Sequence, residues 1–172
     1  IAGALKDDRN VLFDLCNEHD HPDGPISHAD ARILRDAVKA LDPERPVTIS
    51  STGTHLMSPS GRIGSGEADN IGAEAGQGPG SVGVDVLSPH LPRTEDWDTA
   101  TRSRVVAIRA VLRRHGVDLP IYLNEERRAT PGDVLPEGAY RRALSGARSA
   151  AAAGWLFHTA AGFDLATKPF LL

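Results

Sequence analysis

The sequence predicts an α/β fold with a parallel sheet. Short apolar runs alternate with longer segments in which apolar residues recur at helical spacing. This alternation is typical of βα units, because each helix carries the chain back to the start of the next parallel strand. The 172 residues are in the usual range for one domain, and 40% of them are hydrophobic. We therefore expect one domain with a buried core.

Five of the apolar runs have the length of strands rather than of helices. We expect them to lie parallel, with helices or loops between them that cover the sheet. In chain order, the predicted strands are Asn10–Cys16, Val47–Ser51, Val82–Leu87, Ile121–Asn124 and Trp155–His158.

Three segments have the periodicity of amphipathic helices. Ser27 and Asp30 have the spacing of a capping box before the first helix, and Gly116 follows the second at a common left-handed end position. The predicted helices are Ala29–Leu41, Asp98–His115 and about Gly138–Ala153. The expected packing face of the first helix consists of Ile33, Leu34, Ala37, Val38 and Leu41, and that of the second consists of Val105, Ile108, Val111 and Leu112.

The segment from Gly53 to Gly80 breaks the alternation. It is rich in glycine and has little periodicity. A long loop inside a compact domain is uncommon and often functional. We predict a loop here, with one short helix near Asp69–Glu74.

Composition excludes several classes of function. A net charge of −4 argues against a nucleic-acid surface, and no apolar run is long enough to span a membrane. Cys16 is the only cysteine, so no disulfide can form within the chain. Lysine is rare while arginine, alanine and glycine are common, a bias that suggests a GC-rich bacterial source.

Two carboxylates stand at the ends of predicted strands. Asn17-Glu18 follows the first strand, and Glu125 follows the fourth. Cleavage of a glycosidic bond requires two such groups, one to protonate the leaving oxygen and one to attack the sugar carbon or activate water. Glu126 competes with Glu125 for the second role, and we prefer Glu125.

The order of these elements resembles strands four to eight of the clan A glycoside hydrolases. This clan consists of retaining (β/α)8 barrels and includes the family 5 cellulase-like enzymes. Asn17-Glu18 is similar to the Asn-Glu after its fourth strand, and Pro120–Glu125 resembles its seventh strand. Val86–His90 falls where the sixth strand often supplies a histidine or tyrosine, and Trp155 falls where the eighth supplies a sugar-stacking tryptophan. The resemblance covers nearly the whole chain.

The resemblance implies a retaining hydrolase of β-linked sugars that needs no cofactor and binds no metal. Glu18 would be the acid/base and Glu125 the nucleophile, both at the strand ends where such barrels place their active sites. The expected substrate-binding residues are Asn17, on the sugar 2-hydroxyl, together with His90, Trp155, His19 and Arg93. We expect His158 to be structural or to support another residue.

The pattern departs from the clan in one large respect. A clan A barrel has eight strands, and five are predicted here. We therefore expect residues 1–172 to be the C-terminal part of a (β/α)8 catalytic barrel, without its first three βα units. Five strands cannot close a barrel, so the missing half would have to come from the same or another chain.

Two alternatives remain open. The first is a non-catalytic fragment that binds carbohydrate or has a structural role. The second is a metal-dependent hydrolase, because Glu18–Asp23 and His28 contain histidines and carboxylates that could bind zinc. Adjacent residues in a loop seldom bind one ion together, which disfavours the metal alternative.

Overall fold

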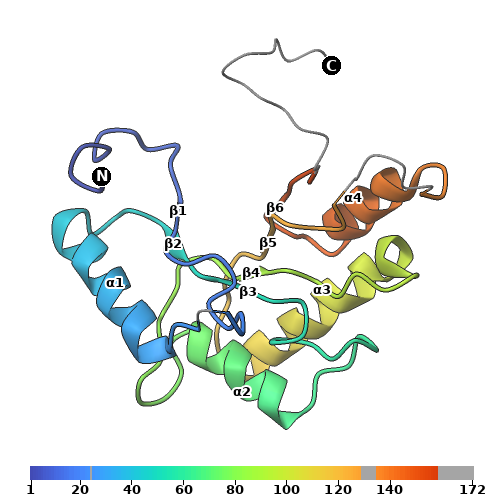
Figure 1. Cartoon of the computed structure of the whole chain (residues 1–172), viewed down its shortest axis with the longest axis horizontal. Coiled ribbons are helices and arrows are strands. Elements are labelled where there is room, and N and C mark those ends of the chain that lie inside the picture. The colour runs from blue at the N-terminus through green and yellow to red at the C-terminus, as the bar shows by residue number, and fades with distance from the viewer. Residues whose placement is uncertain (24, 129–134, 159–172) are drawn as a thin grey trace.

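The computed structural model describes residues 1–23, 25–128 and 135–158. Short strands meet in the middle of the molecule, and four helices lie outside them (Figure 1). The strands are β1 (Phe13–Asp14), β2 (Val47–Thr48), β3 (Ser50–Ser51), β4 (Ser88–Pro89), β5 (Tyr122–Leu123) and β6 (Gly154–Trp155). The helices are α1 (His28–Leu41), α2 (Ser65–Glu74), α3 (Trp97–Arg114) and α4 (Ala139–Ser149).

All strand pairs are parallel, as predicted. β1 pairs with β2, β3 with β4 and β5 with β6, while a single parallel bridge joins Leu87 to Ile121. The successive apolar segments therefore lie side by side in chain order. The α/β class is confirmed, and the count of five barrel strands is not, because the described residues form three separate two-stranded pairs.

Every strand is two residues long, and two of them are displaced from the predicted positions. β4 follows the predicted strand Val82–Leu87, of which only Leu87 forms a bridge, and β6 shares only Trp155 with the predicted strand Trp155–His158.

Side-chain carboxylates accept backbone hydrogen bonds at two points of the ladder. The backbone N–H of Val47 donates to the Asp85 carboxylate at 2.9 Å, and that of Ser50 donates to the Asp14 carboxylate at 3.1 Å. The predicted strand Val47–Ser51 is thereby divided at Ile49. Its first part pairs with β1 and its second part pairs with β4.

The helix boundaries agree closely with the prediction. The Ser27 hydroxyl caps α1 by accepting a hydrogen bond from the Asp30 N–H at 3.1 Å. Gly116 follows the end of α3 with a φ of +71°, the left-handed conformation that glycine adopts without strain. The glycine-rich segment contains α2, which is longer than the predicted short helix.

The core lies between the strands and the inner faces of α2 and α3. Ile49, Leu87 and Ile121 come from the strand segments and are fully buried. Against them pack Ile71 of α2 and the predicted apolar face of α3, which consists of Val105, Ile108, Val111 and Leu112. Among the described residues, no helix has both the length and the hydropathy that crossing a membrane requires.

The predicted packing face of α1 is largely wrong. Ile33, Leu34 and Leu41 are 65%, 41% and 57% exposed, and Ala31 is the buried residue of the helix. α1 stands at one end of the row of strands, so it has a neighbouring element on one side only (Figure 1). Its amphipathic pattern therefore reflects a surface that no other described element covers.

Candidate active site

Three predicted residues meet at the ends of parallel strands. Glu18 follows β1, His90 follows β4 and Glu125 follows β5. His90 lies between the two carboxylates, with Nδ1 2.9 Å from Glu18 Oε1 and Nε2 3.8 Å from Glu125 Oε2. One carboxylate oxygen of Glu18 lies within 4.8 Å of one carboxylate oxygen of Glu125. The fold thus brings both candidate catalytic groups and one imidazole together.

A turn in an uncommon conformation positions Glu18. Its φ is +46°, in the left-handed region that residues other than glycine seldom occupy. The Glu18 N–H donates to the Ser50 hydroxyl at 3.0 Å, and the His19 N–H donates to the Ser50 carbonyl at 3.0 Å. These bonds to β3 hold the turn. Conformations of this kind cost free energy and cluster at functional sites.

Cationic side chains surround Glu125. Arg93 donates a 2.7 Å hydrogen bond to its carboxylate, while Arg128 and His158 lie 3.5 and 3.9 Å from the same oxygen. Burial alone would raise the pKa of Glu125. The hydrogen bond from Arg93 and the positive charges of His90, Arg93 and His158 outweigh burial and hold the pKa below its usual range. Glu125 is therefore ionised at neutral pH.

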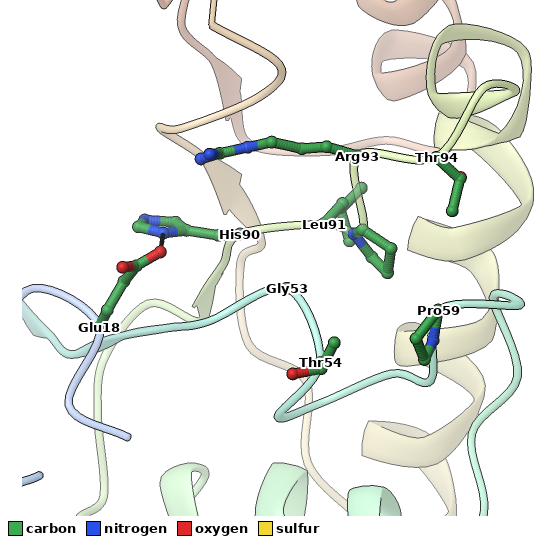
Figure 2. A pocket seen from close by; sticks show the side chains of 9 residues that line it. Glu18, Gly53, Thr54, Pro59, His90, Leu91, Arg93 and Thr94 are labelled. Atoms are coloured by element: carbon green, nitrogen blue, oxygen red, sulfur yellow. Dashed lines mark hydrogen bonds and ion pairs between the residues drawn. The ribbon is translucent and has the colours of Figure 1, made fainter. Parts of the chain in front are cut away.

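Glu18 and His90 face a pocket whose other walls come from two loops (Figure 2). One loop follows β4 and carries Leu91, Pro92, Arg93 and Thr94. The other follows β3 and carries Gly53, Thr54 and Pro59. A Cβ at Gly53 would stand 3.1 Å from the His90 carbonyl oxygen and 3.2 Å from that of Leu91. Glycine therefore lets the two loops approach closely beneath His90.

Glu126, the alternative to Glu125, lies elsewhere. It is 2% exposed, and its Oε1 has no hydrogen-bond partner among the described residues. Burial raises the pKa of Glu126 to about 7, although Arg104 and Arg93 oppose the shift. Its carboxyl group belongs to the interior and is not part of the group formed by Glu18, His90 and Glu125.

The other predicted site residues occupy varied positions. Arg93 lines the pocket and is bonded to Glu125. Asn17 is exposed beside β3, where it accepts a 3.3 Å bond from the Ser50 hydroxyl. Trp155 is half-buried and packs on the apolar residues of α3 and α4, with its ring centroid 6.4 Å from that of Tyr140. A sugar-stacking role for Trp155 stays a prediction.

His19 lies outside the pocket. Its ring is 3% exposed, and Nε2 is 3.3 Å from Glu74 of α2. His19 belongs to a second group of possible ligands, whose other members are His28, His55 and Glu74. Glu18, His90 and Glu125 form the other such group among the described residues.

Two features of the site could not be found from the sequence. Arg128 belongs to no apolar run or motif, yet it adds positive charge beside Glu125. The loop after β3 supplies one wall, and its only sequence signals were the glycines and prolines of an aperiodic segment. His158 contacts the chain next to Glu125, because its Nδ1 lies 3.2 Å from the Glu126 carbonyl oxygen. This contact fits the predicted structural or supporting role.

Comparisons with known proteins were made by sequence and by structure. No protein-family model and no curated protein matches the sequence. Among solved structures, XacCel5A in complex with cellopentaose matches with a TM-score of 0.56 and 20% identity, over 98% of this chain and 56% of its own. The endo-1,4-beta-D-mannanase from Thermotoga petrophila RKU-1, with maltose and glycerol, matches with a TM-score of 0.49 and 18% identity, over 77% of this chain and 40% of its own.

Both structures are family 5 glycoside hydrolases of clan A. This chain spans about half the length of either solved chain. The likeness to XacCel5A supports the resemblance that the sequence suggested, and at 20% identity it shows the fold alone. The chain has the fold of part of a glycoside hydrolase barrel.

Proposed function

We propose that the chain carries the acid/base and the nucleophile of a retaining glycoside hydrolase that acts on β-linked sugars. The observation that carries this proposal is the approach of one oxygen of Glu18 to within 4.8 Å of one oxygen of Glu125. Glu18 lines the pocket, and so does Arg93, which is bonded to Glu125. Retaining enzymes hold their carboxyl groups about 5–5.5 Å apart, and inverting enzymes hold them about 6.5–9.5 Å apart. A nearest oxygen–oxygen approach of this size is compatible with the retaining separation, and double displacement is the mechanism that we propose.

Glu125 is the nucleophile in this proposal. Its lowered pKa keeps the carboxylate ionised, and Arg93 fixes one oxygen by a 2.7 Å bond, so that the other oxygen can attack the anomeric carbon. The attack forms a glycosyl ester and expels the leaving group. Arg93, which we had expected to bind substrate, then acts by orienting the nucleophile.

Glu18 is the acid/base. It would protonate the departing oxygen in the first step and take a proton from water in the second. His90 Nδ1 bonds to Glu18 at 2.9 Å and restricts its rotamers. Asn17 and Trp155 remain proposed contacts to the sugar, the first to a hydroxyl and the second to a ring face. His19 contributes through the turn that it shares with Glu18.

We further propose that activity requires a completed barrel. The chain matches 56% of XacCel5A, and the exposed apolar side chains Ile33, Leu34 and Leu41 of α1 form a surface that a preceding βα unit could cover. The remaining strands would come from the same or another chain. They would close the sugar site on the side of β1.

Trapping of the covalent intermediate tests the proposed function. The protein is incubated with 2,4-dinitrophenyl 2-deoxy-2-fluoro-β-glycosides of glucose, mannose and their β-1,4 disaccharides, alone and with a donor N-terminal half-barrel. We expect one added sugar at Glu125, identified by peptide mass spectrometry. Glu125→Gln should abolish labelling. Glu18→Gln should still be labelled, because 2,4-dinitrophenolate leaves without protonation, but it should lose the hydrolysis of natural glycosides, whose leaving oxygen needs a proton. Glu95→Gln removes the charge of an exposed carboxylate and should have no effect.

Each other outcome has a defined meaning. A label on Glu126 or elsewhere would overturn the assignment of the nucleophile. Sugar binding without labelling or turnover, unchanged in Glu125→Gln, would favour the non-catalytic carbohydrate-binding alternative. Turnover that a chelator abolishes would favour the metal-dependent alternative.

A further inference from the structure

Four side chains that lie far apart in the sequence form a second cluster. His19 follows β1, His28 is the first residue of α1, His55 follows β3 and Glu74 is the last residue of α2. One ligand atom from each lies within 4.8 Å of all the others. The imidazole centroids are 4.8 to 5.8 Å apart. Three imidazoles therefore surround one carboxylate.

Polar groups at the rear of two rings orient them toward that carboxylate: a hydrogen-bonded carbonyl behind His19 and a carboxylate behind His55. His19 Nδ1 is 3.1 Å from the Ile26 carbonyl oxygen, so it donates its proton there, and Nε2 faces Glu74 Oε1 at 3.3 Å. His55 Nδ1 is 3.5 Å from the Asp20 carboxylate, and its Nε2 is 3.8 Å from the same Glu74 oxygen. A carbonyl or carboxylate behind the ring is the usual support of a metal-binding histidine.

Three polar atoms inside the cluster lack hydrogen-bond partners among the described residues. Glu74 is fully buried, and its Oε2 makes no hydrogen bond among the described residues. The same holds for Nε2 of His28 and of His55. Burying a carboxylate and imidazole nitrogens without partners is costly, and no Arg or Lys side chain is paired with Glu74 in the described part of the chain. A cation between these atoms would satisfy all of them.

We propose that His19, His28, His55 and Glu74 bind one divalent transition-metal ion, with zinc as the best fit. Zinc prefers imidazole and carboxylate ligands at about 2.0–2.2 Å in tetrahedral geometry. Such geometry brings ligand atoms to within about 3.5 Å of each other, so the cluster needs to contract by about 1 Å. Four protein ligands leave no open position, which indicates a structural site.

The ion has a route to the cluster. His19, His28 and His55 line a surface pocket together with Ser27 and Asp30 of the α1 N-terminus. The Asp20 carboxylate behind His55 is itself held, because it accepts a 2.7 Å bond from the Thr52 N–H. The site rests on its own residues and does not depend on the proposed hydrolase activity.

Metal titration tests the inference. The protein is stripped with a chelator, and Zn²⁺ is titrated in competition with a chromophoric chelator. We expect one zinc ion per chain, and with Co²⁺ the intense visible absorption of a four-coordinate site. His28→Ala and His55→Ala should each weaken zinc binding by at least about 100-fold. His21→Ala changes a half-exposed histidine near His19 that belongs to neither cluster, and it should leave the affinity unchanged.

Circular dichroism and thermal melting check that each variant folds. His28 is half-buried at the pocket, so His28→Ala still tests the site if His55→Ala does not fold. Absence of a one-to-one zinc complex in the wild-type protein would overturn the proposal and would mean that a protonated His19 balances Glu74. Equal zinc affinity in His28→Ala and the wild type would overturn it as well.

Discussion

Glu18 and His19 are neighbours in the chain, yet they belong to two clusters of opposite composition. In the first, two carboxylates share one imidazole, and Arg93 and Arg128 supply positive charge. In the second, three imidazoles share the buried carboxylate of Glu74, and no guanidinium or ammonium group is paired with it in the described residues. The first cluster is electrostatically balanced by its own side chains, whereas the second needs a cation from solution.

The largest expected effect is a loss of hydrolysis without a loss of zinc binding, because we assign the two clusters different functions. Glu125→Gln removes the proposed nucleophile, so hydrolysis by the completed barrel should fall by at least about 10³-fold. Zinc affinity should not change, because Glu125 is not part of the second cluster. Steady-state kinetics and a zinc titration on the same protein check both expectations. A variant that lost zinc and activity together would show that the clusters are not independent.

Glu126 provides a reference carboxyl group that belongs to neither cluster. Because its folded-state pKa is raised to about 7, its contribution to stability is fully present below about pH 4.5 and is lost as the pH rises through about 7. The change amounts to about 3 kcal/mol. Urea unfolding at pH 4.5 and pH 8 should show Glu126→Gln gaining about this much relative to wild type. An equal difference at both pH values would contradict the assigned shift.

Replacing Arg93 tests the role of positive charge in the first cluster. Because the hydrogen bond and charge of Arg93 hold down the pKa of Glu125, Arg93→Met should raise that pKa. The acidic limb of the pH profile of kcat/KM should therefore move to higher pH. Glu95→Gln, an exposed change on the same loop, serves as the control. If the acidic limb of the kcat/KM profile does not move, a group other than Glu125 determines that limb.

The smallest expected effect concerns the helix that carries His28. Ser27→Ala removes the N-cap of α1 and should lower the free energy of unfolding by about 1 kcal/mol. Zinc affinity should fall by a few-fold at most, and turnover should not change. Urea unfolding and zinc titration measure the two effects. A loss of turnover would place the α1 N-terminus within the sugar site.

The strand-end residues could be predicted from the sequence, while the second cluster could not. Glu18, His90 and Glu125 each follow an apolar run, and the carboxyl ends of parallel strands share one edge. His55 and Glu74 come from the aperiodic segment after β3, where no periodicity indicates which residues face inward. Around His19 the sequence shows adjacent histidines and carboxylates with His28 nearby, and adjacent loop residues seldom bind one ion together, so the sequence disfavours a metal there.

The fold could be predicted to a similar extent. Hydrophobic periodicity located three helices to within a few residues and identified the buried face of α3. The same periodicity gave a wrong buried face for α1. Periodicity shows that one face of a helix is apolar, but it does not show that another element covers that face. The apolar runs predicted longer strands than the two-residue strands of the structure, and Val82–Leu87 precedes β4 instead of forming it. An apolar run indicates that a segment is buried and extended, but not where its partner strand pairs with it.

The left-handed turn at Glu18 has a thermodynamic consequence. The peptide bond between Glu18 and His19 joins one residue of each cluster. If a ligand at one cluster orders this turn, it reduces the conformational entropy that a ligand at the other cluster must still remove. Coupling of this kind is reciprocal. If zinc tightens the binding of sugar by some factor, sugar must tighten the binding of zinc by the same factor.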